Sequence, residues 1–143
     1  MKKIIIGMLL LQALLVSACS STVIPYEPTA HMTREEARSI LKQTFEEQPE
    51  KYRPVTIEIG DDAIRLGVWT TKQNAWTGVH TTVEGRETYY FSNLADLQLV
   101  QNKGRLLIKL SNREGSVQRW VRFFSEKQGT DFLDATSRMA QSD

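Results

Sequence analysis

Few side chains in this chain of 143 residues could perform covalent or metal chemistry. It holds one cysteine, Cys19, and two histidines, His31 and His80. A first-row metal site needs three or four converging ligands, and neither histidine adjoins a cysteine. Nucleophilic catalysis needs an activated serine, cysteine or lysine beside a base, and the sequence has no Gly-x-Ser-x-Gly element and no glycine-rich nucleotide loop. We therefore expect a protein that is not an enzyme and that has no metal and no cofactor.

The charge balance and the cysteine count exclude further classes. The chain has 18 basic and 17 acidic residues, for a formal net charge of +1. Without residues 1–18, which carry Lys2 and Lys3 and no acid, 16 basic residues face 17 acidic ones. A protein that binds nucleic acid electrostatically needs a clear basic surplus, so we expect no nucleic-acid partner. The single cysteine excludes an internal disulfide framework, and the length predicts one domain.

The first eighteen residues have the order of a secretory signal. Met1-Lys2-Lys3 is cationic, Ile4–Val16 is an apolar run broken only by Gly7 and Gln12, and Ser17-Ala18 are small. Thirteen residues of helix span about 20 Å, whereas a hydrocarbon core is about 30 Å thick. The run is therefore too short for a permanent transmembrane helix, and we predict a signal peptide over residues 1–18.

Val16-Ser17-Ala18-Cys19 resembles the lipobox of bacterial lipoproteins, in which a branched aliphatic residue and two small residues precede a required cysteine. The resemblance implies cleavage between Ala18 and Cys19. It also implies a diacylglyceryl group on the thiol, and a further acyl chain such as palmitate on the freed amino group. Position +2 is Ser20 rather than the aspartate that retains such proteins in an inner membrane. The expected location is therefore the periplasmic face of an outer membrane, or the outer leaflet if the cell has one membrane.

The mature chain is expected to begin with a tether at residues 19–31, in which Pro25 and Pro28 disfavour a helix. Fully extended, this tether would reach about 40 Å. One globular domain should then occupy residues 32–143. It opens with a helix over residues 33–47, because Thr33 and Glu36 form a capping box ahead of an apolar stripe.

Apolar residues alternate with polar ones along the middle of the chain, from about residue 53 to residue 124. A final helix over residues 126–141 follows Ser125 as its cap, and Gly129 predicts that its firm part begins near Thr130. The facing of the last strand stays open, because alternate apolar residues compete for the interior. The expected strands are residues 55–59, 64–68, 77–83, 86–91, 97–99, 106–110 and 117–124, with Glu84-Gly85 as a turn between the third and fourth.

Seven short strands and a C-terminal helix have the order of a pleckstrin-homology-like barrel. The segment from Tyr90 to Leu97, continuing to Leu110, is similar to the middle of GRAM-type and bacterial PH-like domains. The resemblance spans about residues 53–141 and implies an α+β barrel with a C-terminal capping helix, preceded here by an extra helix. A cystatin-like or NTF2-like helix on a sheet is the alternative fold. The first turn is the acidic Gly60-Asp61-Asp62, which would repel a phosphate headgroup, so inositol-lipid binding is not implied.

One segment, Trp69 to His80, combines two tryptophans and a histidine in or beside a polar loop. Loops on rigid scaffolds often bind partners, and exposed indoles are good anchors, so Trp69, Trp76 and His80 are candidate binding residues. In the alternative interpretation, Trp69 ends a core strand and Trp76 packs across the barrel mouth. The leading hypothesis is a membrane-anchored, non-catalytic envelope lipoprotein that binds a protein, a peptide or an envelope component. A lipid or small-ligand carrier and a hydrolase of envelope polymers are the alternatives.

Overall fold

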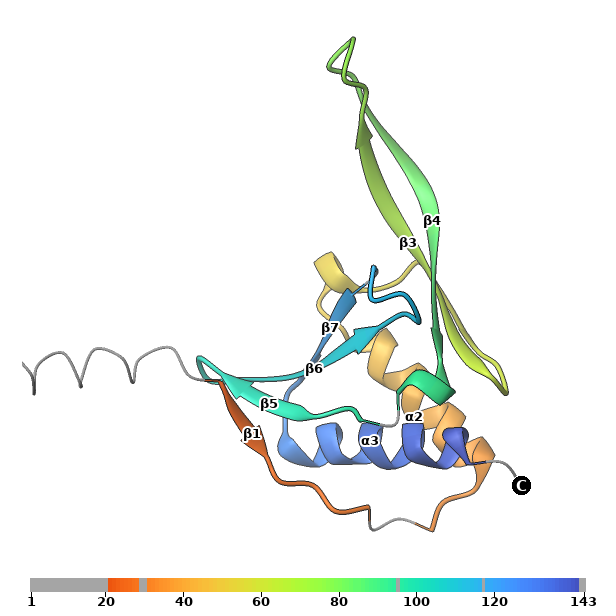
Figure 1. Cartoon of the computed structure of the whole chain (residues 1–143), viewed down its shortest axis with the longest axis vertical. Coiled ribbons are helices and arrows are strands. Elements are labelled where there is room, and N and C mark those ends of the chain that lie inside the picture. Colours follow the sequence, from red (N-terminus) through yellow and green to blue (C-terminus); the bar gives the residue numbers. More distant parts are fainter. Residues whose placement is uncertain (1–20, 29–30, 95, 117, 142–143) are drawn as a thin grey trace, which may run out of the picture.

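The structure of the chain is a computed structural model that describes residues 21–28, 31–94, 96–116 and 118–141. The expected signal peptide, the lipobox and Cys19 lie outside the described residues. The described part is α+β, with two α-helices and two antiparallel sheets (Figure 1). None of its helices has both the length and the hydropathy needed to cross a membrane.

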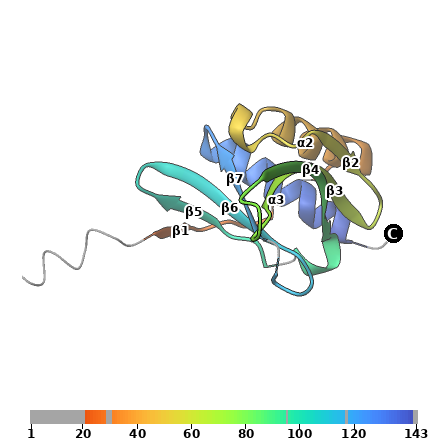
Figure 2. The same ribbon diagram turned by 90° about the horizontal axis from the view of Figure 1, so that it is seen from above.

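The two sheets contain four and three strands. The first has the order β1-β5-β6-β7 and the second β2-β3-β4. In Figure 2, which views the molecule from above, β1, β5 and β6 extend to the side opposite the β2-β3-β4 sheet. The bounds are β1 Thr22–Ile24, β2 Thr56–Ile59, β3 Ala63–Gln73, β4 His80–Tyr90, β5 Leu99–Asn102, β6 Arg105–Ser111 and β7 Gln118–Phe123, with helices α2 Arg34–Glu46 and α3 Glu126–Ala140 and the short 3₁₀ turns η2 Glu50–Tyr52 and η3 Phe91–Asn93.

The two sheets do not close into a barrel, so that part of the prediction is wrong. Strand β2 has only four residues and pairs with β3, not with β7. Beside β7, the place of a neighbouring strand is taken by one side chain. The amide of Gln48 donates to the carbonyl of Arg122 at 2.9 Å and accepts from its N–H at 3.0 Å. The barrel stays open because the first strand of the β2-β3-β4 sheet is too short to reach β7.

The helices follow the predicted bounds within a residue or two. Thr33 and Glu36 form the expected capping box, with the Glu36 N–H donating to Thr33 Oγ1 at 3.2 Å and the Thr33 N–H donating to Glu36 Oε2 at 2.7 Å. Ser125 caps α3, which starts at Glu126 as expected. A Cβ atom at position 129 would lie 2.7 Å from both methyl carbons of Leu99. Gly129 therefore allows α3 to approach β5.

The core lies between the helices and the inner faces of the sheets. Helices α2 and α3 pack on each other, α2 contacts β2, and α3 contacts β6 and β7. In β7, Val121 and Phe123 are buried while Trp120 is exposed, as is Phe124 just after the strand, which settles the facing of this strand. The buried cluster also includes apolar residues of α2, β3, β4, β5, β6 and α3: Leu41, Phe45, Ile64, Leu66, Tyr89, Leu99, Ile108, Leu110, Phe132, Leu133 and Met139.

Several strand predictions differ from the structure. Strand β3 runs to Gln73 rather than ending at Val68, and the strand expected from Thr77 begins at His80. Strand β4 runs without a break through Glu84-Gly85, where a turn was expected, because Gly85 pairs with Val68 in a continuous ladder to β3. The strand expected at residues 97–99 begins at Leu99 instead and runs to Asn102, followed by a turn in which Lys103 and Gly104 both have positive φ. At Glu84-Gly85, pairing with a distant segment decides the outcome rather than the local sequence.

The segment predicted to be a free tether is held against the domain where the structure describes it. Thr22–Ile24 pair with β5, and the phenol of Tyr26 donates a hydrogen bond to Asp134 on α3. Further along, Arg138 Nε donates to the carbonyl of Met32 at 3.2 Å. Partial burial and then the bond to Asp134 raise the pKa of Tyr26. The prediction of a tether over residues 19–31 is therefore wrong for Thr22–Ile24 and for Tyr26.

We expect Tyr26→Phe to destabilise the fold by about 1.5–3 kcal/mol near neutral pH, because a hydrogen bond to a charged group is lost. The sign of the pH dependence follows from the raised pKa. The unfolded phenol releases its proton near pH 10, before the folded one does, so this contribution is present below pH about 10 and declines above it. Urea unfolding of both proteins at pH 7 and at alkaline pH measures the effect. An unchanged midpoint at pH 7 would contradict it.

Candidate functional site

The outer half of the β3–β4 hairpin projects from the body as a two-stranded arm (Figure 1). We define the arm as residues 69–84. Strand β2 pairs with β3 only as far as Gly67, so the arm has no third strand among the described residues. Every residue of the arm is exposed. A two-stranded ribbon that packs on nothing else is only marginally stable in water. The arm therefore depends on the body of the domain for its stability.

The tip of the arm is nevertheless a well-bonded turn. The side-chain oxygen of Asn74 accepts from the N–H of Trp76 at 2.9 Å and from that of Thr77 at 3.3 Å. Gly78 has a φ of +67°, and its N–H donates to the carbonyl of Asn74 at 2.9 Å, while the Asn74 N–H donates to Val79. Asn74 favours this geometry because its side chain imitates a main-chain acceptor. The turn presents Trp76 to solvent with 97% of its surface exposed.

The structure places all three candidate binding residues on the arm. Trp69 is 64% exposed in β3, Trp76 is at the tip, and His80 begins β4. Strand register puts Trp69 opposite Glu84 and Gln73 opposite His80, so Trp69 and His80 lie on the same face of the ribbon. The alternative in which Trp69 lies in the core and Trp76 packs across the barrel mouth is wrong, because both indoles face solvent.

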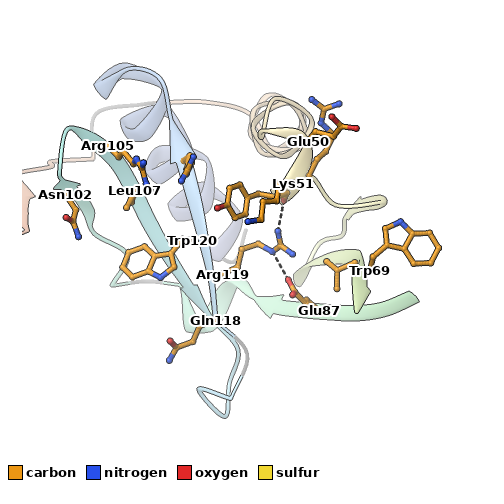
Figure 3. Close-up of a pocket in the computed structure, with 14 residues that line it drawn as sticks. Glu50, Lys51, Trp69, Glu87, Asn102, Arg105, Leu107, Gln118, Arg119 and Trp120 are labelled. Carbon is orange, nitrogen blue, oxygen red and sulfur yellow. Dashed lines mark hydrogen bonds and ion pairs between the residues drawn. The ribbon is translucent and has the colours of Figure 1, made fainter. Parts of the chain in front are cut away.

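Below the arm, the gap between the two sheets forms a groove of about 670 Å³, which we call the inter-sheet groove (Figure 3). Its walls come from η2, β3, β4, the β5–β6 hairpin and β7. Trp69 lies at its edge, and Trp120 projects from β7. Its charge is mainly positive: the carboxylates Glu50 and Glu87 face five cations, Lys51, Arg53, Arg105, Arg119 and Arg122.

A half-buried ion pair joins the two sheets in this groove. Arg119 Nε donates to Glu87 Oε2 at 2.7 Å, and Arg119 Nη1 donates to the carbonyl of Tyr52 at 2.9 Å. The phenol of Tyr89 donates to the same Glu87 oxygen at 2.9 Å. Burial and the neighbouring Glu87 raise the pKa of Tyr89. Burial alone would lower the pKa of Arg119, but Glu87 raises it overall, so the guanidinium stays charged.

Other cations in the groove lie against aromatic rings. The Arg122 guanidinium is 4.8 Å from the centre of the Tyr52 ring, and the Lys51 ammonium is 5.8 Å from it. On the β6–β7 face, the Lys109 ammonium is 5.9 Å from the Trp120 ring. Such contacts orient a cation without neutralising it. Arg105 is exposed, and its guanidinium has no hydrogen bond or ion pair with the described residues. The groove therefore offers oriented positive charge to a ligand.

Among residues 21–28, 31–94, 96–116 and 118–141, no three histidine, cysteine, aspartate or glutamate side chains gather closely enough to hold a metal ion. Of the residues that line the groove, only Trp69 is a candidate that the sequence predicts. Alternation in the last strand could have placed Arg119 beside the interior, but the apolar pattern of that strand was ambiguous.

No protein-family model, curated protein or solved structure matches the chain.

We expect Arg119→Leu to destabilise the protein by about 3 kcal/mol, because it leaves Glu87 poorly paired in a half-buried place. Glu87→Gln should cost less, since the amide still accepts a hydrogen bond. A double-mutant cycle of Arg119→Leu and Glu87→Leu, followed by urea unfolding, measures the coupling. Arg113→Leu in an exposed turn is the control and should change stability by less than about 0.5 kcal/mol. Additive effects of the two substitutions would show that the sheets are not joined through this pair.

Proposed function

We propose that this chain is a lipid-anchored envelope protein that binds a partner without catalysis, and that the arm is its main contact. Exposure of Trp76 at the end of a bonded turn is the observation that supports this most directly. Large apolar side chains exposed on protruding elements are enriched at protein interfaces, where tryptophan is a frequent hot-spot residue. Trp69 and His80 would extend the contact along one face.

The finer fold is also a proposal. A three-stranded sheet is followed by the consecutive antiparallel strands β5, β6 and β7 and then by helix α3. This order supports an opened relative of the PH-like fold, in which α3 covers the core and the uncovered side becomes the inter-sheet groove. The pairing of β1 with β5 adds a fourth strand at the far edge of the second sheet.

The anchor would hold the domain near the bilayer. Two residues separate Cys19 from Thr22, which pairs with Gln101. Since consecutive Cα atoms are about 3.8 Å apart, three peptide bonds allow at most about 11 Å between an anchored residue and this sheet, in place of the expected 40 Å tether. The start of β1 lies beside the β5–β6 hairpin, and the arm leaves the body in another direction (Figure 1). An anchored molecule would thus rest with the β1–β5–β6 end nearest the membrane.

Of the alternatives, a carrier of apolar ligands finds less support. The buried residues form one packed cluster, and the large groove is open and mainly cationic. An apolar lipid chain would leave these charges without partners, which is costly. The groove supports an anionic ligand instead. A hydrolase would need converging acid and base groups, and Glu87, the half-buried carboxylate of the groove, is occupied by Arg119 and Tyr89.

Cross-linking in the native envelope tests the proposed role of the arm. We expect Trp76→Ala to reduce partner affinity about thirtyfold, since removing a hot-spot side chain costs about 2 kcal/mol or more. The measurement is the yield of cross-linked partner that copurifies with the protein. Phe124→Ala is the matched control, because Phe124 is an exposed aromatic residue (72%) outside the arm. Equal yields from the wild type and both variants would reject the arm as the contact.

A further inference from the structure

The outer edge of β7 faces the inter-sheet groove without a neighbouring strand. The Arg122 N–H and carbonyl point away from β6, because both bond to the side chain of Gln48, and the Phe124 N–H bonds to Gln128. Main-chain groups of a strand point to alternate sides with a period of two, so the N–H and carbonyl of Trp120 also point away from β6. No other described segment donates to or accepts from the main chain of Trp120. This stretch is an open strand edge.

Gln48 shows that this edge accepts a strand-like partner. Its side-chain amide is 3% exposed and makes the same pair of bonds to Arg122 that a neighbouring residue in a ladder would make. On the opposite wall, the Val55 N–H donates to the carbonyl of Gly67 at 2.7 Å, which is the last bond from the β2 side. Two residues further, the main chain of Trp69 points to the same side and has no partner there among the residues that the structure describes. The groove therefore lies where the missing strand of a closed barrel would run.

The groove's charges define the chemistry of the occupant. Five cations and two carboxylates line it, and one of those carboxylates, Glu87, already pairs with Arg119. The Arg105 guanidinium has no hydrogen-bond or ion-pair partner among the described residues, and the Arg122 guanidinium lies against the Tyr52 ring. An extended segment on β7 would bring every second side chain toward these cations. The groove's volume of about 670 Å³ is also in the range of functional binding pockets.

We propose that the inter-sheet groove binds an extended acidic peptide segment of a partner protein, which adds to the edge of β7 as a strand. Main-chain bonds to Trp120 supply register, and acidic side chains pair with Arg105 and its neighbours. The proposal builds on the proposed role as a binding module, but it concerns a second surface and does not depend on the arm tip or on the lipid.

The first test uses probe peptides with the full chain purified in detergent. We expect an octapeptide that alternates threonine and glutamate to bind, and an octapeptide that alternates threonine and lysine not to bind. The same acidic peptide with alternate N-methylated amides should bind at least about fivefold more weakly, because it cannot complete the ladder. Fluorescence anisotropy gives the affinities, and hydrogen exchange should show slower exchange of the Trp120 amide with the acidic peptide. Equal binding of the acidic and basic peptides, or of the methylated peptide, would overturn the proposal.

Variants of the chain give a second, independent test. Trp120→Pro removes the outward N–H, which an edge strand tolerates, while Trp120→Ala removes only the side chain. We expect the proline variant to bind the acidic peptide at least about fivefold more weakly than the alanine variant, and Arg105→Gln to weaken binding and its salt dependence. If the proline variant does not fold, as judged by thermal unfolding, the N-methylated peptide on the wild type decides the same question.

Two further experiments separate this proposal from its alternatives. Trp76→Ala should bind the acidic peptide as the wild type does, so a failed arm contact and a failed groove contact give different results. Vesicles of phosphatidylglycerol test for a lipid headgroup. If Arg105→Gln weakened vesicle binding while no acidic peptide bound the wild type, the groove would be a lipid site and the proposal would be wrong.

Discussion

Replacing Cys19 with serine is expected to move the protein from the membrane fraction to the aqueous fraction. Lipidation of the kind implied by the lipobox requires the thiol, and serine cannot form the thioether. Each buried methylene contributes about 0.8 kcal/mol, so two or three acyl chains hold a protein on a bilayer far more firmly than one. The wild type should therefore partition into the detergent phase of a two-phase separation, incorporate labelled palmitate, and gain the corresponding mass. The variant should show none of these.

A matched pair of substitutions makes this test specific. Ser20→Ala changes the neighbouring residue and should leave lipidation and membrane association unchanged. Ser20→Asp should keep the lipid but, in a cell with two membranes, shift the protein toward the inner membrane, as the lipoprotein rule at position +2 implies. Wild-type protein that carries an unmodified thiol at Cys19, or a serine variant that stays in the membrane fraction, would refute the anchor.

The elements that could be predicted from sequence are those whose signal is local. The capping box of Thr33 and Glu36 fixes the start of α2 within one turn, and Ser125 does the same for α3. Alternation from Ile64 to Val68 and from Leu106 to Leu110 identifies two strands and their buried faces. In each case, the residues that decide the structure lie within a few positions of one another, so the pattern is sufficient.

The features that escaped prediction depend on distant partners. Thr22–Ile24 has no periodicity, and it is a strand only because β5 offers its edge. Glu84-Gly85 resembles a turn, but Val68 pairs with Gly85 and keeps β4 straight through it. The barrel stays open because β2 is short and because Gln48, an ordinary polar residue in the sequence, bonds to β7 from the end of α2.

The candidate site divides in the same way. The arm could be predicted as a polar segment with two tryptophans, because indoles in a polar loop between strands are a local signal. The inter-sheet groove could not, since its cations come from segments between residues 51 and 122 that only the fold brings together. The pairing of Arg119 with Glu87 joins residues of different sheets, and nothing near either residue in the sequence indicates it.

Phe132 is the ring that contacts both Phe45 and Phe123, and Phe132→Ala should be among the most destabilising single substitutions in the domain. Its ring is fully buried on α3, with its centre 6.0 Å from that of Phe45 on α2 and 5.5 Å from that of Phe123 on β7. The rings meet edge to face, at interplanar angles of 77° and 61°, which is a favoured geometry. One side chain thus connects both helices to the sheet that forms a wall of the groove.

We expect Phe132→Ala to lower the free energy of unfolding by about 3–5 kcal/mol, through lost burial and the cavity left behind. A domain of this size has a total stability of about 5–15 kcal/mol, so the variant should be partly unfolded at moderate temperature and should lose both binding surfaces together. Urea unfolding followed by tryptophan fluorescence measures the change. Phe124→Ala removes the same ring from a solvent-exposed place and should shift stability by no more than about 0.5 kcal/mol. Similar losses from the two alanine variants would mean that Phe132 does not hold the helices to the sheet.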